Sequence, residues 1–219
     1  MYRILFEHPA FLVIDKLPGI GMHDEKGDGE AVNPGLVNRV KADTGLTLYP
    51  VHRLDKMTSG LVLLARTTEA NRELSMAFAA REVSKQYLAL SDRKPKKKQG
   101  WVKGDMQKGR GGSWLLARTL ENPAISWFDS VSVREGLRLY RIKPQTGKTH
   151  QIRVALKSIG APILGDERYG GTAAERGYLH AWRLSFNLAG EPFDFVCPPC
   201  VGSEFVTPEL TAAIATLAP

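Results

Sequence analysis

The sequence lacks the features that mark secreted, membrane-spanning or disulfide-stabilised proteins. Among 219 residues only Cys197 and Cys200 are cysteines, too few for a disulfide framework, so we expect a reducing compartment. The C-P-P-C pair has no second pair to complete a zinc site and is not followed by a helical pattern as a redox pair would be, which favours incidental thiols. The N-terminal stretch is interrupted by Glu7, His8 and Asp15, and no apolar run is long enough to cross a bilayer. These absences predict a cytoplasmic protein that does not enter a membrane.

Several catalytic signatures are missing as well. The chain has no H-E-x-x-H, no G-x-S-x-G nucleophile elbow and no G-x-G-x-x-G after a strand. Residues 145–153 read QTGKTHQIR and contain the GKT that ends a phosphate-binding loop. That loop needs a glycine five positions before Gly147, where this chain has Ile142, and a branched residue cannot replace the tight turn. We therefore expect neither a P-loop, nor a metal, nor a cofactor.

Positive charge is in excess. Thirty Lys and Arg residues oppose 23 Asp and Glu residues, which gives a formal net charge of +7. Such a balance favours a polyanionic partner, nucleic acid before an anionic membrane surface, although a merely basic protein would look the same. The basic run 93–98, RKPKKK, is either a solvated loop or a phosphate contact.

Hydrophobic periodicity predicts an α+β protein. Strands are expected at 11–16, 60–65, 85–90, 136–144 and 178–186, helices at 35–44, 68–82 and 208–218, a loop at 21–34, and short strands and turns over 99–135. The elements do not follow a regular βαβ rhythm, and no linker or repeat interrupts them. The pattern predicts one domain spanning 1–219, of a size common for enzymes.

A further helix is expected after QTGKTH. Its apolar stripe comprises Ile152, Ala155, Leu156 and Ile159 and ends at Gly160. A second, cationic face carries His150, Arg153 and Lys157. Thr146 or Thr149 is expected to cap the helix N-terminus.

The segment 50–60, PVHRLDKMTSG, places charged residues directly before an apolar strand. Asp55 lies close to Arg53 and Lys56, and nearby cations keep a carboxylate ionised, as a nucleophile or general base requires. The structural alternative is a turn aspartate followed by T-S-G. The sequence offers no second carboxylate to pair with Asp55, which leaves a reaction carried by one carboxylate.

Five segments in order resemble one enzyme family. They are IDKLPGIGMH at 14–23, HRLDKMTSGLVLLAR at 52–66, KQYLAL at 85–90, the long motif from KPQTGKTHQIR to GDERYGG at 143–171, and LHAWRLSF at 179–186. Together they resemble the RluA-like pseudouridine synthases. Two departures are Leu17, inserted in the family's K-P turn, and Ala155, which replaces a common His and puts substrate contacts in question. Set beside the family, the chain is expected to be a single catalytic domain without a separate S4-like RNA-binding domain, so substrate choice is expected to come from this domain, its basic loop 93–98 and the segment 101–118.

The resemblance implies that the protein is an isomerase converting selected uridines of ribosomal or transfer RNA to pseudouridine. It implies that Asp55 attacks the ribose C1′ or assists glycal formation, that Tyr87 lies beside the target base, and that Arg153 pairs with the catalytic carboxylate. Because the base must leave its stack first, Arg53 is a candidate to fill the vacated space. The family further implies a mixed, largely antiparallel sheet with flanking helices and a central RNA-binding cleft, in a monomer without an obligatory protein partner.

Other residues of these motifs are expected to contact RNA: His52, Arg53, Lys85, Lys148, His150, Gln151 and Lys157. Taken without the family, Tyr87 would be a core strand residue and Arg153 a surface helix cation. Two rival functions remain, a non-catalytic RNA-binding protein on the same scaffold and a nucleoside-hydrolase-like enzyme that releases free base.

Overall fold

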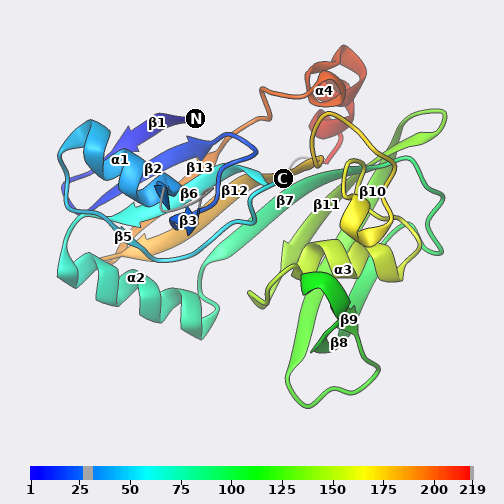
Figure 1. The fold of residues 1–219 in the computed structure, drawn as a ribbon, viewed down its shortest axis with the longest axis horizontal. Helices are drawn as coiled ribbons and strands as arrows, with labels where there is room; N and C mark the ends of the chain where they lie inside the picture. The colour runs from blue at the N-terminus through cyan, green and yellow to red at the C-terminus, as the bar shows by residue number, and fades with distance from the viewer. Residues whose placement is uncertain (27–31, 218–219) are drawn as a thin grey trace. The chain divides into compact units, whose positions relative to one another are not determined.

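A computed structural model describes residues 1–26 and 32–217. Its strands form mixed, mostly antiparallel sheet structure, and four α-helices lie in the described part of the chain (Figure 1). The chain divides into two compact units: unit 1 comprises residues 1–84 and 181–198, and unit 2 comprises residues 85–180 and 199–219. In the described ranges, no helix is both long and apolar enough to span a membrane.

Unit 1 is built on a sheet whose central strands are buried on both faces. Its elements are β1 (Tyr2–Glu7), β2 (Phe11–Lys16), β3 (Glu25–Lys26), β4 (Val32–Asn33), α1 (Leu36–Thr44), β5 (Tyr49–Pro50), β6 (Ser59–Ala65), α2 (Thr68–Ala80) and β13 (Glu191–Val196). The order is β1-β2-β6-β12-β13, with β5 added to β6. Every residue of β2 and β6 is buried, which explains their uninterrupted apolar runs. Helix α2 packs on β5 and β6 and is capped by Thr67.

Unit 2 holds a second group of antiparallel strands. Its elements are β7 (Ser84–Ser91), β8 (Gly100–Lys108), β9 (Trp114–Leu116), β10 (Pro123–Arg134), β11 (Leu137–Pro144), α3 (Gln151–Ser158) and α4 (Pro208–Ala215), with short 3-10 turns at Arg110–Gly112, Glu167–Tyr169 and Ser203–Val206. The order is β7-β11-β10-β8-β9. Helix α3 packs across β8, β9 and β10, and α4 packs on β10 and β11 (Figure 1). Strand β12 (Leu179–Leu188) begins in unit 2 and continues into unit 1.

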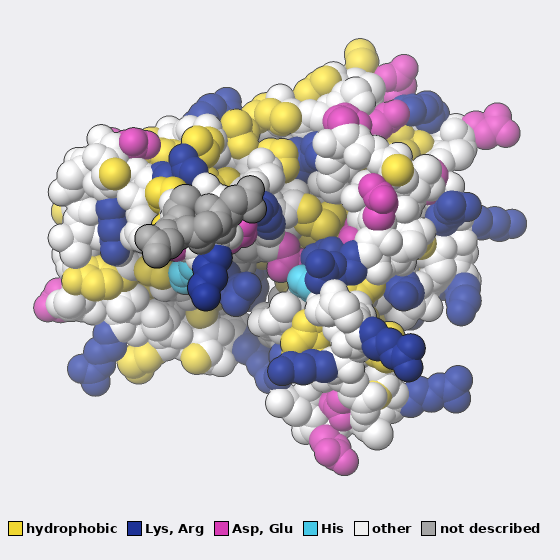
Figure 2. Space-filling view, in the orientation of Figure 1, with side chains coloured by type: hydrophobic (Ala, Val, Ile, Leu, Met, Phe, Trp, Pro, Cys, Tyr) yellow, Lys and Arg dark blue, Asp and Glu magenta, His cyan; other side chains and the backbone are white. Residues whose placement is uncertain are grey.

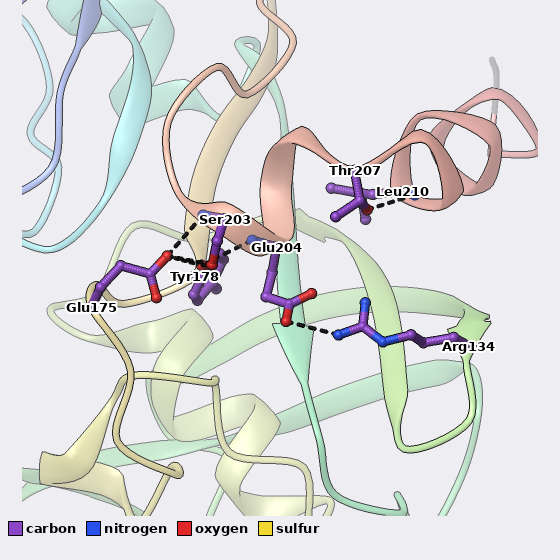
Figure 3. A network of polar contacts seen from close by, with 7 residues as sticks. All are labelled: Arg134, Glu175, Tyr178, Ser203, Glu204, Thr207 and Leu210. Atoms are coloured by element: carbon purple, nitrogen blue, oxygen red, sulfur yellow. Dashed lines mark hydrogen bonds and ion pairs between the residues drawn. The ribbon is translucent and has the colours of Figure 1, made fainter.

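The C-terminal segment is tied to unit 2 by a polar network (Figure 3). The Glu175 carboxylate accepts hydrogen bonds from Ser203 N at 2.8 Å, from Ser203 Oγ at 2.9 Å and from the Tyr178 hydroxyl. The hydrogen bond from Tyr178 and the amide of Ser203 lower the pKa of Glu175 to about 2. Arg134 Nη2 pairs with Glu204 Oε1 at 2.7 Å. The end of strand β10 and the segment that leads into α4 are thereby held together.

Most expected elements are confirmed, with corrections in two regions. The strands predicted at 11–16, 60–65 and 85–90 and the helices at 35–44 and 68–82 are present within two residues at their ends. The prediction of only short strands over 99–135 is wrong, because β8 and β10 are long. Strand β8 contains two glycines and β10 begins with proline. Both carry many polar residues, and burial alternates along part of each, which hides the strand pattern from a search for apolar runs. The edge strands β1 and β13 were not predicted, and part of the loop expected at 21–34 lies outside the described residues.

Candidate active site

Asp55 lies in a turn between β5 and β6 and is half-buried. The turn closes by a hydrogen bond from Thr58 N to the Asp55 carbonyl at 3.0 Å. Beneath it, the fully buried Lys16 of β2 donates through Nζ to the carbonyl oxygens of Leu17, Lys56 and Thr58 at 3.0, 3.1 and 2.6 Å. A buried ammonium is tolerated only when its donors are satisfied, so Lys16 and this turn fix each other.

Gly60 allows the strand after the turn to pass close to β12. Its φ is +104°, and a Cβ atom at this position would lie 2.2 Å from the carbonyl oxygen of Ala181. No L side chain fits such an approach, which explains why the T-S-G of the motif ends in glycine.

The His52 side chain makes its contacts within unit 1. Its Nε2 accepts a hydrogen bond from Leu63 N at 2.9 Å, and its ring stacks on Phe78 of α2 with centroids 4.9 Å apart. A neutral imidazole that accepts at Nε2 carries its proton on Nδ1. Arg53, the next residue, is exposed. The segment before Asp55 is therefore anchored by one side chain and presents a cation with the next.

In unit 2, Arg153 is held by two residues of the G-D-E-R-Y-G-G segment. Its Nε and Nη2 donate to Asp166 Oδ2 and Oδ1, each at 2.7 Å, and its guanidinium lies 4.9 Å from the centroid of the Tyr169 ring. The side chains of Arg153 and Asp166 are 9% and 2% exposed. A bidentate pair of this kind sets the orientation of the guanidinium as well as its charge.

His150 begins α3 in an unusual conformation. Its φ is 56°, in the left-handed region, and no side chain caps the helix, so the expected cap by Thr146 or Thr149 is wrong. The His150 Nδ1 lies 2.8 Å from the Tyr169 hydroxyl, which also accepts a hydrogen bond from Trp114 N at 2.9 Å. Lys157 Nζ lies 5.6 Å from the same ring. The cationic face predicted for this helix thus converges on Tyr169.

Gln151 holds the QTGKTH loop together. Its Oε1 accepts from Thr146 Oγ1 at 2.7 Å and from Lys148 N at 3.0 Å, while its Nε2 donates to Ile125 O at 3.0 Å and Ser126 Oγ at 2.9 Å. Gln151 is buried, so these four bonds satisfy its amide. The Thr146 hydroxyl that was expected to cap the helix is used here instead. Lys148 is partly exposed, and its Nζ lies 2.8 Å from Asn122 Oδ1.

Tyr87 and Lys85 are half-buried neighbours on one face of β7. Tyr87 of β7 is paired with Ile142 of β11, which is paired in turn with Phe128 of β10, so these three side chains share one face. Ser126, two residues before Phe128, lies on the same face and accepts a hydrogen bond from Gln151 of α3. Tyr87 and α3 therefore lie on the same face of the unit 2 strands. Burial lowers the pKa of Lys85. Figure 2 shows Lys and Arg side chains gathered over α3 and the β8–β9 hairpin.

The predicted residues fall into two groups. Unit 1 holds His52, Arg53 and Asp55, and unit 2 holds Lys85, Tyr87, Lys148, His150, Gln151, Arg153 and Lys157. The carboxylate beside Arg153 within unit 2 is Asp166, and its pairing with Asp55 stays a prediction, as does the central cleft. Prediction from sequence missed Lys16, Asp166 and Tyr169 as site residues, although all three lie in the motifs that carried the resemblance. Among the described residues, no group of three or more His, Cys, Asp or Glu side chains could hold a metal ion.

Comparison with known proteins identifies the family. Residues 10–158 match the family model described as RNA pseudouridylate synthase. The chain belongs to the RNA pseudouridine synthase family, whose members are isomerases. The matched range contains Asp55, Tyr87 and Arg153, whereas Asp166 and Tyr169 follow it.

Relatives agree along nearly the whole chain. An uncharacterized RNA pseudouridine synthase of Haemophilus influenzae is 44% identical over 94% of this chain and 91% of its own length. Ribosomal large subunit pseudouridine synthase D of Nitrosomonas europaea is 34% identical over 83% of this chain, which spans 57% of that protein. The solved structure of human RNA Pseudouridylate Synthase Domain Containing 1 has a TM-score of 0.76 at 22% identity, covering 97% of this chain and 87% of that one. The last comparison confirms the pseudouridine synthase fold.

Proposed function

We propose that this enzyme isomerises specific uridines of structured RNA, with Asp55 as the nucleophile. The observation that carries the proposal is the construction around Asp55, whose turn rests on the buried Lys16 and is followed by the glycine that brings β6 against β12. A half-buried carboxylate on a rigid turn suits attack at one defined carbon. Arg153 is proposed to pair with this carboxylate, and Tyr87 to stack on the target base after it leaves the RNA.

The proposed reaction is balanced without a cofactor. The bond between ribose C1′ and N1 of uracil breaks while Asp55 attacks C1′ or assists glycal formation, and the base turns so that C5 faces C1′. The C5–C1′ bond then forms as the Asp55–C1′ bond breaks or, in the glycal route, as the proton taken from C2′ is returned; C5 loses its proton to solvent, and N1 gains one. No net electron transfer occurs, and the atoms of uridine and pseudouridine are the same.

Ribosomal RNA is the first substrate to test. Relatives with a stated target, from Nitrosomonas europaea and Rickettsia bellii, are named as ribosomal large subunit enzymes, while the 44% identical relative has no stated substrate. Transfer RNA is the second. Substrate choice is proposed to come from the catalytic part itself, through its basic run 93–98, the segment 101–118 and exposed cations such as Arg53 and Lys157.

The decisive experiment measures tritium release from RNA labelled at C5 of uracil. The wild type should release tritium into water from a ribosomal or transfer RNA fraction, and the Asp55→Ala variant should release none. Asp55→Asn, with nearly the same shape, controls for folding. Release by the alanine variant at the wild-type rate would refute Asp55 as the nucleophile, and free uracil in the mixture would indicate hydrolysis in place of isomerisation.

A further inference from the structure

Two tryptophans and two lysines form an aromatic, cationic surface on unit 2. Trp101 of β8 is paired in register with Trp127 of β10, which is paired in turn with Lys143 of β11. Lys103 lies two residues along β8 from Trp101. Side chains paired in this way share one face of a sheet, so we call Trp101, Lys103, Trp127 and Lys143 the tryptophan stripe.

The tryptophan stripe lies on the face opposite to Tyr87. Tyr87 is paired with Ile142, whose side chain points to the other side of β11 from Lys143. Part of the stripe's face is covered, because Arg141 binds Asp129 and donates to the carbonyl of Leu217 just after α4. In the next row along the strands Trp101 is 43% exposed, and Trp127 and Lys143 are half-buried. The stripe is therefore a surface distinct from the residues proposed to act on the uridine.

The side chains of the stripe combine two properties. Lys103 Nζ lies 5.2 Å from the centroid of the Trp101 ring, and Lys143 Nζ lies 5.5 Å from that of Trp127. An exposed indole offers a flat surface on which another ring can stack, and a lysine whose ammonium lies over the indole offers charge to an anion. A ligand that uses both must carry flat rings and negative charges at short intervals, as a nucleic acid strand does.

The basic run 93–98 lies next to β8, with Lys97 Nζ 5.7 Å from the centroid of the Phe128 ring, on the face opposite to the stripe. Lys97 Nζ donates to the Trp101 carbonyl at 2.5 Å, and Arg93, Lys94, Lys96, Lys97 and Lys98 are exposed. The run thus ends beside the first residue of the stripe. A protein partner that covered the stripe would have to bury ammonium groups, which is costly without matching carboxylates. A phosphate backbone pairs with them while most of their surface stays in water.

We propose that the tryptophan stripe binds a single-stranded segment of the RNA substrate outside the target uridine, with one base stacked on Trp101 and phosphates near Lys103 and Lys143. The inference rests on the RNA substrate of the family and not on the role of Asp55. It predicts that the enzyme binds single-stranded RNA that contains no uridine.

The test is fluorescence anisotropy with a short fluorescein-labelled oligoadenylate, which offers stacking bases and phosphates but no substrate base. Trp101→Ala should weaken binding about tenfold, because it removes one stacked base, whereas Trp101→Phe should retain most of the affinity. Lys103→Gln should reduce the slope of log affinity against log salt by about 0.7, the share of one phosphate contact on a single strand. The matched controls are Met76→Ala and Arg72→Gln on α2, exposed residues whose replacement should change neither quantity. Thermal melting followed by circular dichroism checks that every variant folds.

Two results would overturn the inference. The first is that Trp101→Ala leaves the affinity for oligoadenylate unchanged and Lys103→Gln leaves the salt dependence of binding unchanged. The stripe would then contact a protein partner or solvent and not RNA. The other is a tenfold loss in Arg72→Gln as well, which would make the effect one of net charge. Since Asp55→Ala should lose tritium release and keep oligoadenylate binding, the proposed function and this inference can fail separately.

Discussion

Replacing Asp166 by Asn removes the carboxylate that holds Arg153 while nearly preserving shape. Both side chains are almost fully buried, at 2% and 9% exposed, so the guanidinium would keep its charge inside unit 2 with a neutral partner. Breaking a buried pair on one side typically costs about 3–5 kcal/mol. Because an amide still accepts one hydrogen bond, we expect a loss at the lower end, about 3 kcal/mol. For a chain of this length that lowers the melting temperature by roughly 6–12 °C.

Activity should fall further than stability alone explains. If Asp166 and Tyr169 set the orientation of Arg153, a displaced guanidinium should slow tritium release by about 100-fold at a temperature where the variant is folded. The control for stability is Asp194→Asn in the Arg183–Asp194 pair, which is 27% and 44% exposed and should cost less than about 1 kcal/mol. The double variant Arg153→Leu/Asp166→Leu should regain much of the melting temperature without regaining activity. A melting temperature and a rate that both match those of the wild type in Asp166→Asn would refute this reasoning.

Three further outcomes follow from the contacts described above. Gly60→Ala should lower the free energy of unfolding by about 3 kcal/mol, because φ is +104° and the new methyl group would overlap the Ala181 carbonyl. Urea denaturation measures this loss, and the control Gly45→Ala, at a positive φ but in open space, should lose less. Lys16→Met should lower both the melting temperature and the tritium-release rate, since the carbonyls of the Asp55 turn lose their buried donor; an unchanged rate in the folded variant would show that the turn does not need it. Hydrogen bonds lower the pKa of Glu175 from 4.5 in the unfolded chain to about 2, so they stabilise the C-terminal segment fully above pH 4.5, and this stabilisation is lost as the pH falls through about 2. Proteolysis of the C-terminal segment should therefore become faster over this pH range, and Glu175→Gln should remove that pH dependence.

Sequence patterns predicted the strands in which most residues are buried and failed for the long strands β8 and β10, in which fewer than half are. Strands β2 and β6 consist of buried residues throughout, so their sequences are continuous apolar runs. In β10 the burial alternates over Pro123–Phe128, and half-buried positions carry Pro123, Trp127 and Asp129. Reasoning from one sequence weighs proline and aspartate as turn signals, whereas the pairing of β10 with two neighbouring strands decides the structure of the folded protein.

The candidate site shows the same limit for side chains. The position of Asp55 among cations in HRLDK made it a candidate, with a turn aspartate as the alternative, and only the family resemblance implied a catalytic role. The sequence does not show whether a polar side chain faces a ligand or the protein interior. Gln151 and His52 lie in the same motifs as the proposed catalytic residues, yet both side chains hydrogen-bond to backbone groups inside the protein. Asp166 was visible as part of G-D-E-R-Y-G-G but could not be given a role until the backbone brought it to Arg153.

Burial also decides which cations can contribute to RNA binding. Lys16 and Arg153 count toward the net charge of +7, but their ammonium and guanidinium groups are enclosed by carbonyls and a carboxylate and hold few counterions to release. The salt dependence of affinity comes from released counterions, so it should follow the exposed cations, chiefly the run 93–98 together with Lys103. Replacing Lys96, Lys97 and Lys98 by Ala should therefore flatten the salt dependence of RNA binding by roughly 2, at about 0.7 per single-strand phosphate contact, if all three contact phosphate. A slope unchanged by that triple replacement would mean that the basic run is a solvated loop and that the cations of the α3 face carry the electrostatic attraction instead.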